Sequence, residues 1–187
     1  MQKRNIIFDL DGTVIDTSHR YRNTSEGHCD LDFWFANSTP EMIARDKLLP
    51  LAAIWRGYWS AGHTIIVCTA RDFSPLNGVD LGAIYRKFLF DNALFYDHLL
   101  FRNMAGDDHE NMGDGELKTR LIGDLAAQLG YSSIAAMDAI MFDDNVKVIA
   151  EMCRQRVDCF DAESYNRQLG NGKAMPPSLG RKLGLAA

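Results

Sequence analysis

The most informative segment of the sequence is Ile6-Ile7-Phe8-Asp9-Leu10-Asp11-Gly12-Thr13-Val14. Its apolar first part predicts a buried β-strand over residues 5–8, which leads directly into two acids. Acids at positions i and i+2 of an extended chain point to the same side, where their charges repel each other. A divalent cation relieves that repulsion, and protein-bound Mg²⁺ takes carboxylate ligands and often a substrate phosphate. The segment therefore predicts a magnesium site at the end of a strand.

Gly12 and Thr13 extend this prediction. Glycine allows a sharp turn directly after the acids, and Thr13 offers a hydroxyl and a backbone N–H near the same point. A lone Asp-x-Asp pair is also typical of a solvated turn, so the pair alone does not establish a metal site. The rest of the chain must supply further polar groups for that interpretation.

The composition predicts a folded single domain without a general affinity for nucleic acid. The chain has 187 residues, of which 47% are hydrophobic, and a formal net charge of -5. A broad non-specific nucleic-acid surface would normally be basic. The four cysteines lack metal-ligand spacing, and no signal peptide or membrane-length apolar segment is visible. We therefore expect no membrane association and a location in the cytoplasm, which is the host cytoplasm if the protein is viral.

Apolar strand-like segments alternate with helical patterns along the chain. Strands are predicted at residues 5–8, 64–68, 98–101, 139–142 and 157–160, and helices at 51–61, 81–92, 116–129 and 146–155. This alternation is typical of an α/β fold, a three-layer Rossmann-like arrangement with a mostly parallel, five-stranded central sheet. We expect the domain to cover residues 1–165, with a small flap at about 14–45 and a C-terminal tail at 166–187.

Polar side chains follow three of these strands at the point where each strand ends. Asp9 and Asp11 follow the first strand, Thr69 follows the second, and Asp143 and Asp144 follow the fourth. Ligands of open parallel sheets bind beyond the carboxyl ends of the strands. We therefore expect these side chains to converge at one edge of the sheet and to form a binding site.

The same residues resemble the four signature motifs of the haloacid dehalogenase superfamily of phosphohydrolases. The motifs correspond here to Asp9-x-Asp11-Gly12-Thr13, to Thr69 after an apolar strand, to Lys118 near the start of a later helix, and to Asp143-Asp144. Their order and strand context agree with the superfamily from about Ile6 to Phe160. Because the dehalogenase branch lacks the second acid of the first motif, the resemblance implies a phosphatase with a minimal cap.

The resemblance also implies a role for each motif residue. Asp9 would attack phosphorus and form an aspartyl-phosphate, while Asp11 would serve first as general acid and then as general base. The implied Mg²⁺ ligands are Asp9, Asp11 through its backbone carbonyl, Asp143 and Asp144. Thr69 and Lys118 would contact the phosphoryl group, and Lys118 would also balance the carboxylates. The candidate substrate contacts are Thr13, Arg20, Arg22, Ala70 and Arg71.

Each assignment has a purely structural alternative, such as a turn or helix cap for Asp11, Asp143 and Asp144, a strand-end position for Thr69, and an exposed cation for Arg71. Lysines on helices usually face solvent, and Lys87 or Lys147 competes with Lys118 on residue type alone. A Gly-Asp-Gly-Glu run before Lys118 places that lysine near the start of its helix, as the superfamily requires.

A closer resemblance bears on the substrate. The segments Ile7–Thr13, Ile65–Arg71 and Ile140–Asn145 are similar to the phosphatase domains of bacteriophage polynucleotide kinase-phosphatases. This resemblance implies removal of 3′-phosphates from nucleic acid ends. Cap insertions usually set substrate size in the superfamily, and a small flap leaves an open site that suits such a large substrate.

Several alternatives to the polynucleotide substrate stay open. A nucleotide 5′-phosphatase or a phosphatase of another small metabolite is the alternative enzyme, and a phosphate-binding module without turnover is the non-enzymatic alternative. The chain lacks the G-x-x-x-x-G-K-[ST] loop of the kinase half, so a separate kinase or ligase is a candidate partner. Tyr21, Phe33 and Trp34 are candidate base-stacking surfaces, with core packing as the alternative. The sequence leaves the oligomeric state open.

Overall fold

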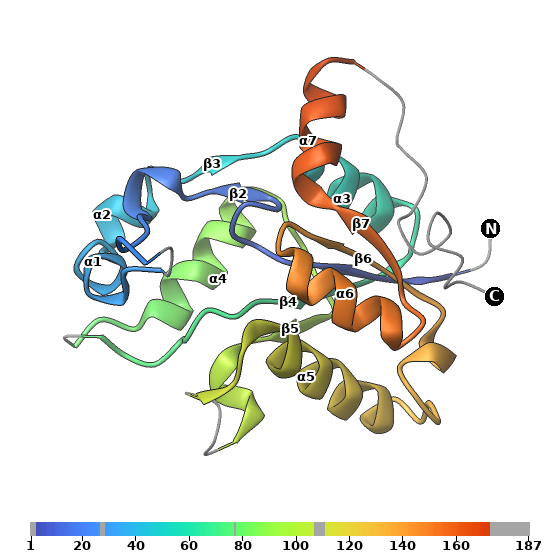
Figure 1. Cartoon of the computed structure of the whole chain (residues 1–187). Helices are drawn as coiled ribbons and strands as arrows, with labels where there is room; N and C mark the ends of the chain where they lie inside the picture. The colour runs from blue at the N-terminus through green and yellow to red at the C-terminus, as the bar shows by residue number, and fades with distance from the viewer. Residues whose placement is uncertain (1–2, 27–28, 77, 107–110, 173–187) are drawn as a thin grey trace.

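The computed structural model describes residues 3–26, 29–76, 78–106 and 111–172. Its centre is a five-stranded parallel sheet with the strand order β5-β4-β1-β6-β7 (Figure 1). The strands are β1 (Asn5–Phe8), β4 (Thr64–Cys68), β5 (His98–Leu100), β6 (Ala139–Asp143) and β7 (Asp158–Asp161). The predicted α/β fold and its five strands are confirmed, with shifts of one residue at some strand ends.

The central strand β1 is buried on both faces, which explains its unbroken apolar sequence. Ile6 pairs with Ile65 of β4 on one side and with Ile140 of β6 on the other. Successive strand residues point to opposite faces of the sheet, so Ile7 joins one apolar cluster while Ile6 and Phe8 join the other.

Helices cover the two faces in separate layers (Figure 1). They are α3 (Leu51–Ser60), α4 (Leu81–Asp91), α5 (Asp114–Gln128), α6 (Val146–Arg154) and α7 (Ala162–Gly170), with short 3-10 turns η2 (Arg102–Ala105) and η4 (Ala135–Met137) in the connections. Buried residues of α5 and α6 pack with Ile7, whereas buried residues of α3 and α7 pack with Ile6 and Phe8. The architecture is therefore three layers deep, as the sequence predicted.

Stacked aromatic rings fill the second cluster. Phe8 stacks on Phe142 of the adjacent strand with 5.0 Å between ring centroids, and Phe142 stacks on Phe160 of β7 at 4.9 Å. Trp55 of α3 covers Phe8 at 5.0 Å and donates its indole N–H to the Phe95 carbonyl. Burying such rings supplies much of the driving force that fixes β1 and β6 side by side.

The region of the predicted flap at residues 14–45 contains several short helices. A short antiparallel pair, β2 (Ile15–Asp16) and β3 (Lys47–Leu48), frames an insert that holds η1 (Ser18–Arg20), α1 (Leu31–Ala36) and α2 (Pro40–Ile43). Local capping explains both short helices: Asp30 accepts the Phe33 N–H, and Thr39 accepts the Met42 N–H directly before Pro40. The insert lies beside α4 (Figure 1).

The C-terminal tail was predicted to begin at residue 166, but the helix α7 continues past that residue to Gly170. Tyr165 of this helix is buried in the second cluster. The Asn166 side chain donates to the Thr13 carbonyl at 2.8 Å and accepts the Leu51 N–H at 2.9 Å. These contacts anchor the segment, while residues 173–187 lie outside the described part of the chain. None of the described helices combines the length and the apolar character needed to cross a bilayer.

Candidate active site

The sheet brings the acids of two distant segments together. Phe8 of β1 pairs in register with Phe142 of β6, so that Asp9 and Asp143 come next along neighbouring parallel strands. The Asp9 backbone N–H donates to the Phe142 carbonyl at 3.0 Å, which continues the sheet up to the acid. Asp9 is 5% exposed and Asp143 is fully buried. The predicted convergence at the carboxyl edge of the sheet is therefore present.

Three of the predicted metal ligands form a compact cluster. Asp9, Asp143 and Asp144 each offer a carboxylate oxygen, and these oxygens lie within 4.8 Å of one another. Burial raises the pKa of Asp9 well above its usual value, against the opposing effect of Lys118, and the neighbouring carboxylates add to the increase. Asp144 is exposed at its outer side, yet partial desolvation and Asp143 raise its pKa to about 6. Clustered hard oxygen donors with unfavourable mutual charge fit Mg²⁺.

Gly12 allows this cluster to close. Its φ of 70° is a left-handed conformation, and a Cβ atom added there would lie 2.2 Å from Oδ2 of Asp144. The position therefore needs glycine both for its backbone angle and for the close approach of the acid. Thr13, predicted to contact substrate, is fully buried, and its hydroxyl donates to Oδ1 of Asp144 at 3.5 Å.

Lys118 lies between two of the acids. Its ammonium group is 2.6 Å from Oδ1 of Asp9 and 2.7 Å from Oδ2 of Asp143. Burial alone would lower the pKa of Lys118, but Asp143 and Asp9 outweigh it and hold that pKa well above its usual value. The competing lysines, Lys87 and Lys147, are exposed on the surface of other helices. The structure thus brings Lys118 to the predicted site and leaves the other two outside it.

Thr69 and Ala70 follow β4 on the other side of β1. Thr69 is 1% exposed, donates its backbone N–H to the Leu100 carbonyl at 3.0 Å, and accepts the Arg71 N–H on its hydroxyl at 3.2 Å. The Ala70 carbonyl accepts Nε of Arg102 at 3.0 Å. Because β1 and β4 pair in register at Phe8 and Val67, this turn comes up at the same edge as Asp9.

Asp11 turns away from the metal-ligand cluster and pairs with Arg71. Nε and one terminal nitrogen of Arg71 each lie 2.6 Å from a different oxygen of Asp11, which is a bidentate ion pair. Burial would raise the pKa of Asp11, but the charge and hydrogen bonds of Arg71 outweigh burial and lower it. The side chain of Asp11 is therefore committed to Arg71, which leaves its backbone carbonyl as the candidate metal ligand.

The alternative interpretation of Arg71 as an exposed cation is wrong, because Arg71 is 5% exposed. Its guanidinium carbon lies 4.1 Å from the ring centroid of Tyr85 on α4. Neither the Asp11–Arg71 pair nor the Tyr85 contact was predicted. A basic residue two positions after Thr69 was the available signal, but its partner is 60 residues away in the sequence.

Arg20, predicted to contact substrate, lies inside the insert, and its contact with substrate stays a prediction. Arg20 is fully buried and makes a bidentate ion pair with Asp46, with two contacts of 2.8 Å. Its guanidinium also lies 4.3 Å from the ring centroid of Trp34, so this ring packs on the ion pair. Arginines are mostly exposed, so full burial is unusual for this residue type. Its partner Asp46 lies at the other end of the insert and could not be identified from sequence.

Arg22 stays at the surface of the insert, where its guanidinium pairs with Asp30 at 2.8 Å and lies 4.2 Å from the ring centroid of Phe33. Tyr21 is 44% exposed and meets Trp34 edge-on at 6.4 Å. These positions leave Arg22 and Tyr21 available to solvent beside the insert helices.

Hydrogen bonds around the cluster involve residues that sequence reasoning missed. The Asn145 backbone N–H donates to Oδ1 of Asp143 at 2.9 Å, and the Asn145 side chain caps α6 by accepting the Lys147 N–H. Arg102 binds the Ala70 carbonyl and also lies 2.8 Å from Oδ1 of Asp114. Arg102 thus ties the Thr69 turn to the start of α5, the helix that carries Lys118. A cap residue at Asn145 is readable from its position before a helix, but the Arg102 contacts are not.

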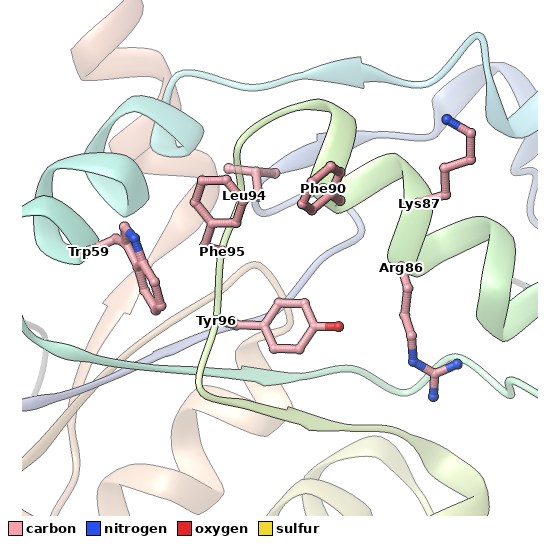
Figure 2. Close-up of a pocket in the computed structure, with 7 residues that line it drawn as sticks. All are labelled: Trp59, Arg86, Lys87, Phe90, Leu94, Phe95 and Tyr96. Carbon is pink, nitrogen blue, oxygen red and sulfur yellow. The ribbon is translucent and has the colours of Figure 1, made fainter.

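A separate pocket of about 650 Å³ lies away from these acids (Figure 2). It is lined by Trp59, Arg86, Lys87, Phe90, Leu94, Phe95 and Tyr96. The lining comes from the end of α3, from α4 and from the segment before β5, whereas the acids follow the carboxyl ends of β1 and β6. The candidate chemistry therefore belongs to the acidic edge and not to this pocket.

The fold of this chain is that of a known class of proteins, the haloacid dehalogenase-like hydrolases. A haloacid dehalogenase-like hydrolase from Streptococcus pneumoniae superposes with a TM-score of 0.54 at 13% identity, covering 84% of this chain and 83% of that one. A HAD-superfamily hydrolase of subfamily IA from Geobacter sulfurreducens gives a TM-score of 0.54 at 11% identity, covering 84% and 88%.

A more specific similarity lies in the first part of the chain. The family model of the bacteriophage T5 5′-deoxynucleotidase matches residues 1–81. The 5′-deoxynucleotidase of Escherichia phage T5 is 39% identical over 72 residues, which is 36% of this chain and 30% of the phage protein. This chain therefore matches about a third of the length of that relative. The range of the family model includes Asp9, Asp11 and Thr69.

Proposed function

We propose that this protein is a Mg²⁺-dependent phosphomonoesterase that works through an aspartyl-phosphate on Asp9. The observation that carries the proposal is the position of Asp9, a buried carboxylate between Lys118 and the acids Asp143 and Asp144. Phosphate monoesters are very unreactive, so splitting their hydrolysis into two displacement steps is advantageous. The structural neighbours named above are hydrolases, which supports the same class of reaction.

In the first step an oxygen of Asp9 would form a bond to phosphorus while the bond to the leaving alkoxide breaks. Asp11, ionised in its pair with Arg71 before substrate binds, would take up one proton when the substrate binds and pass it to that alkoxide. In the second step water would attack the phosphorus, transfer a proton to Asp11 and release inorganic phosphate and free Asp9. Lys118 would hold Asp9 in the attacking orientation and offset negative charge at the site.

Asp9, Asp143 and the Asp11 carbonyl would hold Mg²⁺, with Asp144 beside them. Bound there, the cation would supply charge stabilisation for the transferring phosphoryl group. The Thr69 hydroxyl, which accepts a hydrogen bond from the Arg71 N–H, retains its own proton as a donor to a phosphoryl oxygen.

We propose deoxynucleoside 5′-monophosphates as the substrates. The support is the match of the T5 5′-deoxynucleotidase family model to residues 1–81, which include Asp9 and Asp11, together with the 39% identity over 72 residues to the T5 enzyme. Removal of 3′-phosphates from nucleic acid ends is the second candidate. It is favoured by the small size of the insert between β2 and β3, whose described helices have six and four residues.

The test is a comparison of kcat/KM on three substrates: a deoxynucleoside 5′-monophosphate, a 3′-phosphorylated oligonucleotide and p-nitrophenyl phosphate. We expect turnover in Mg²⁺, a preference for the mononucleotide, and loss of turnover in excess chelator. Asp9→Asn should lower kcat by at least about a thousandfold, whereas Asp124→Asn on the exposed side of α5 should not change it. Undiminished activity of Asp9→Asn would rule out Asp9 as the nucleophile. A strong preference for the oligonucleotide would favour the second candidate.

A further inference from the structure

Tyr85 is a buried residue of α4 that reaches the acid–arginine pair of the site. It is 2% exposed, and Cζ of Arg71 lies 4.1 Å from its ring centroid. The same guanidinium uses Nε and one terminal nitrogen to hold Asp11. Tyr85 therefore contacts the group that fixes the orientation of Asp11 without contacting the site itself.

The second terminal nitrogen of Arg71 explains why the ring is needed. This atom is buried and has no hydrogen-bond partner among the described residues. An aromatic face attracts a guanidinium, more strongly when the cation is removed from water, and its electrons accept weak N–H contacts. The Tyr85 ring, 4.1 Å from the guanidinium carbon, is thus a neighbour that offsets part of the desolvation of this cation.

The Tyr85 ring is itself held from two further directions. Phe73 packs against it with 5.2 Å between centroids, and Cζ of Arg20 lies 5.9 Å from its centroid. Arg20 is fixed by its own bidentate pair with Asp46, in contacts of 2.8 Å. A ring enclosed in this way has little freedom to tilt, so it provides Arg71 with a rigid support.

We propose that Tyr85 is a positioning residue for the reaction, and this inference rests on the proposed phosphomonoesterase function. Through Arg71 it holds Asp11 at the distance and angle needed to protonate the leaving oxygen. The contribution of Tyr85 to kcat/KM should therefore depend on the leaving group. An alkoxide leaving group, such as the 5′ oxygen of a nucleotide, needs a proton as the P–O bond breaks, whereas p-nitrophenolate departs readily without one.

The test uses kcat/KM for a deoxynucleoside 5′-monophosphate and for p-nitrophenyl phosphate. Tyr85→Leu and Tyr85→Met remove the ring but keep a buried apolar side chain. We expect either variant to lower kcat/KM about tenfold for the nucleotide and no more than about twofold for the aryl phosphate. Tyr85→Phe keeps the ring face and should restore the wild-type ratio. Phe160→Leu, which removes a core ring that packs on Phe142 and Tyr165 in the other apolar cluster, should change kcat/KM for both substrates in the same proportion.

The outcomes separate the proposed phosphomonoesterase function from the positioning role of Tyr85. Absence of wild-type activity on both substrates would refute the proposed function itself. An active wild type with an unchanged substrate ratio in Tyr85→Leu and Tyr85→Met would overturn the positioning role, because core damage lowers both rates equally. A ratio in Tyr85→Phe as altered as that in Tyr85→Leu would also overturn it, since the ring face would then not be the cause.

Discussion

The ammonium group of Lys118 lies 2.6 Å from Oδ1 of Asp9, and both side chains are nearly inaccessible to solvent. Lys118 also binds Asp143, so one cation serves two carboxylates. Removing it would leave these buried acids uncompensated. We expect Lys118→Met to lower the free energy of unfolding by about 3–5 kcal/mol in the absence of divalent cations.

Added Mg²⁺ should recover part of the stability lost in Lys118→Met, because a cation among the same carboxylates replaces the missing charge. The measurement is urea denaturation in EDTA and in Mg²⁺. Lys87→Met, at an exposed lysine paired with Asp91, is the matched control and should change stability by less than about 1 kcal/mol. Equal stability losses in Lys118→Met and Lys87→Met would contradict the proposed role of Lys118.

Gly12→Ala should be more harmful than the same change at Gly62. Both glycines have a left-handed φ, 70° at Gly12 and 79° at Gly62, so both substitutions incur backbone strain of about 1 kcal/mol. A Cβ at Gly62 meets no atom within 4 Å, whereas a Cβ at Gly12 collides with Asp144. The excess loss of stability in Gly12→Ala, measured by denaturation, therefore reports the close approach of Asp144. Similar losses in the two variants would show that this approach is not tight.

Asp144→Asn should stabilise the metal-free protein at neutral pH. The pKa of Asp144 is raised to about 6, from about 3.9 in the unfolded chain. The folded state then holds the proton more tightly, so stability is fully present below about pH 4 and falls as the pH rises towards 6.

In EDTA at pH 7 we expect Asp144→Asn to be more stable than wild type by about 1 kcal/mol. The gain is smaller than the pKa shift alone implies, because solvent screens this exposed group. At pH 4 the difference should vanish. Mg²⁺ should reverse the order, because the wild type keeps a full carboxylate ligand. Denaturation curves under the three conditions test this, and a variant less stable than wild type in EDTA at pH 7 would disprove it.

The two ion pairs of the insert should differ greatly in their contribution to the free energy of unfolding. Arg20–Asp46 is buried and bidentate, so Arg20→Met should cost about 3–5 kcal/mol by removing the bidentate partner of Asp46 and leaving this acid with only His19 at 3.5 Å among its ion-pair contacts in the described residues. Arg22–Asp30 is largely exposed on its arginine side, and Arg22→Met should cost less than about 1 kcal/mol. Thermal unfolding of both variants provides the comparison. A small effect of Arg20→Met would argue that the arginine is kept for another role, such as the substrate contact first predicted.

The sheet and the acidic edge could be predicted from sequence because their signals are local. An unbroken apolar run such as Ile65–Cys68 marks a strand buried on both faces, and the residue after each strand must lie at the carboxyl edge. Once β1, β4 and β6 are adjacent, Asp9, Thr69 and Asp143 meet without further information. The order of these residues along the chain also agrees with the motif order of a known superfamily.

The contacts between distant polar residues could not be predicted in the same way. Asp46 and Arg20 are ordinary charged residues in sequence, and only the path of the insert brings them together. Tyr85 looks like one more apolar position of a helix, since nothing nearby in sequence indicates that Arg71 lies over its ring. The helix after residue 161 was missed because its polar composition resembles a tail, whereas Tyr165 and Asn166 anchor it through contacts with distant residues.

The link from Asn166 to the Thr13 carbonyl also has a consequence for how the molecule is made. The two residues are separated by 153 positions, so the turn that follows Asp9 lacks one of its hydrogen bonds until the segment through residue 166 has left the ribosome. A nascent chain with all five strands would still lack the helix that carries Asn166. Competence for the proposed catalysis should therefore arise only after the segment that follows the last strand of the sheet has emerged.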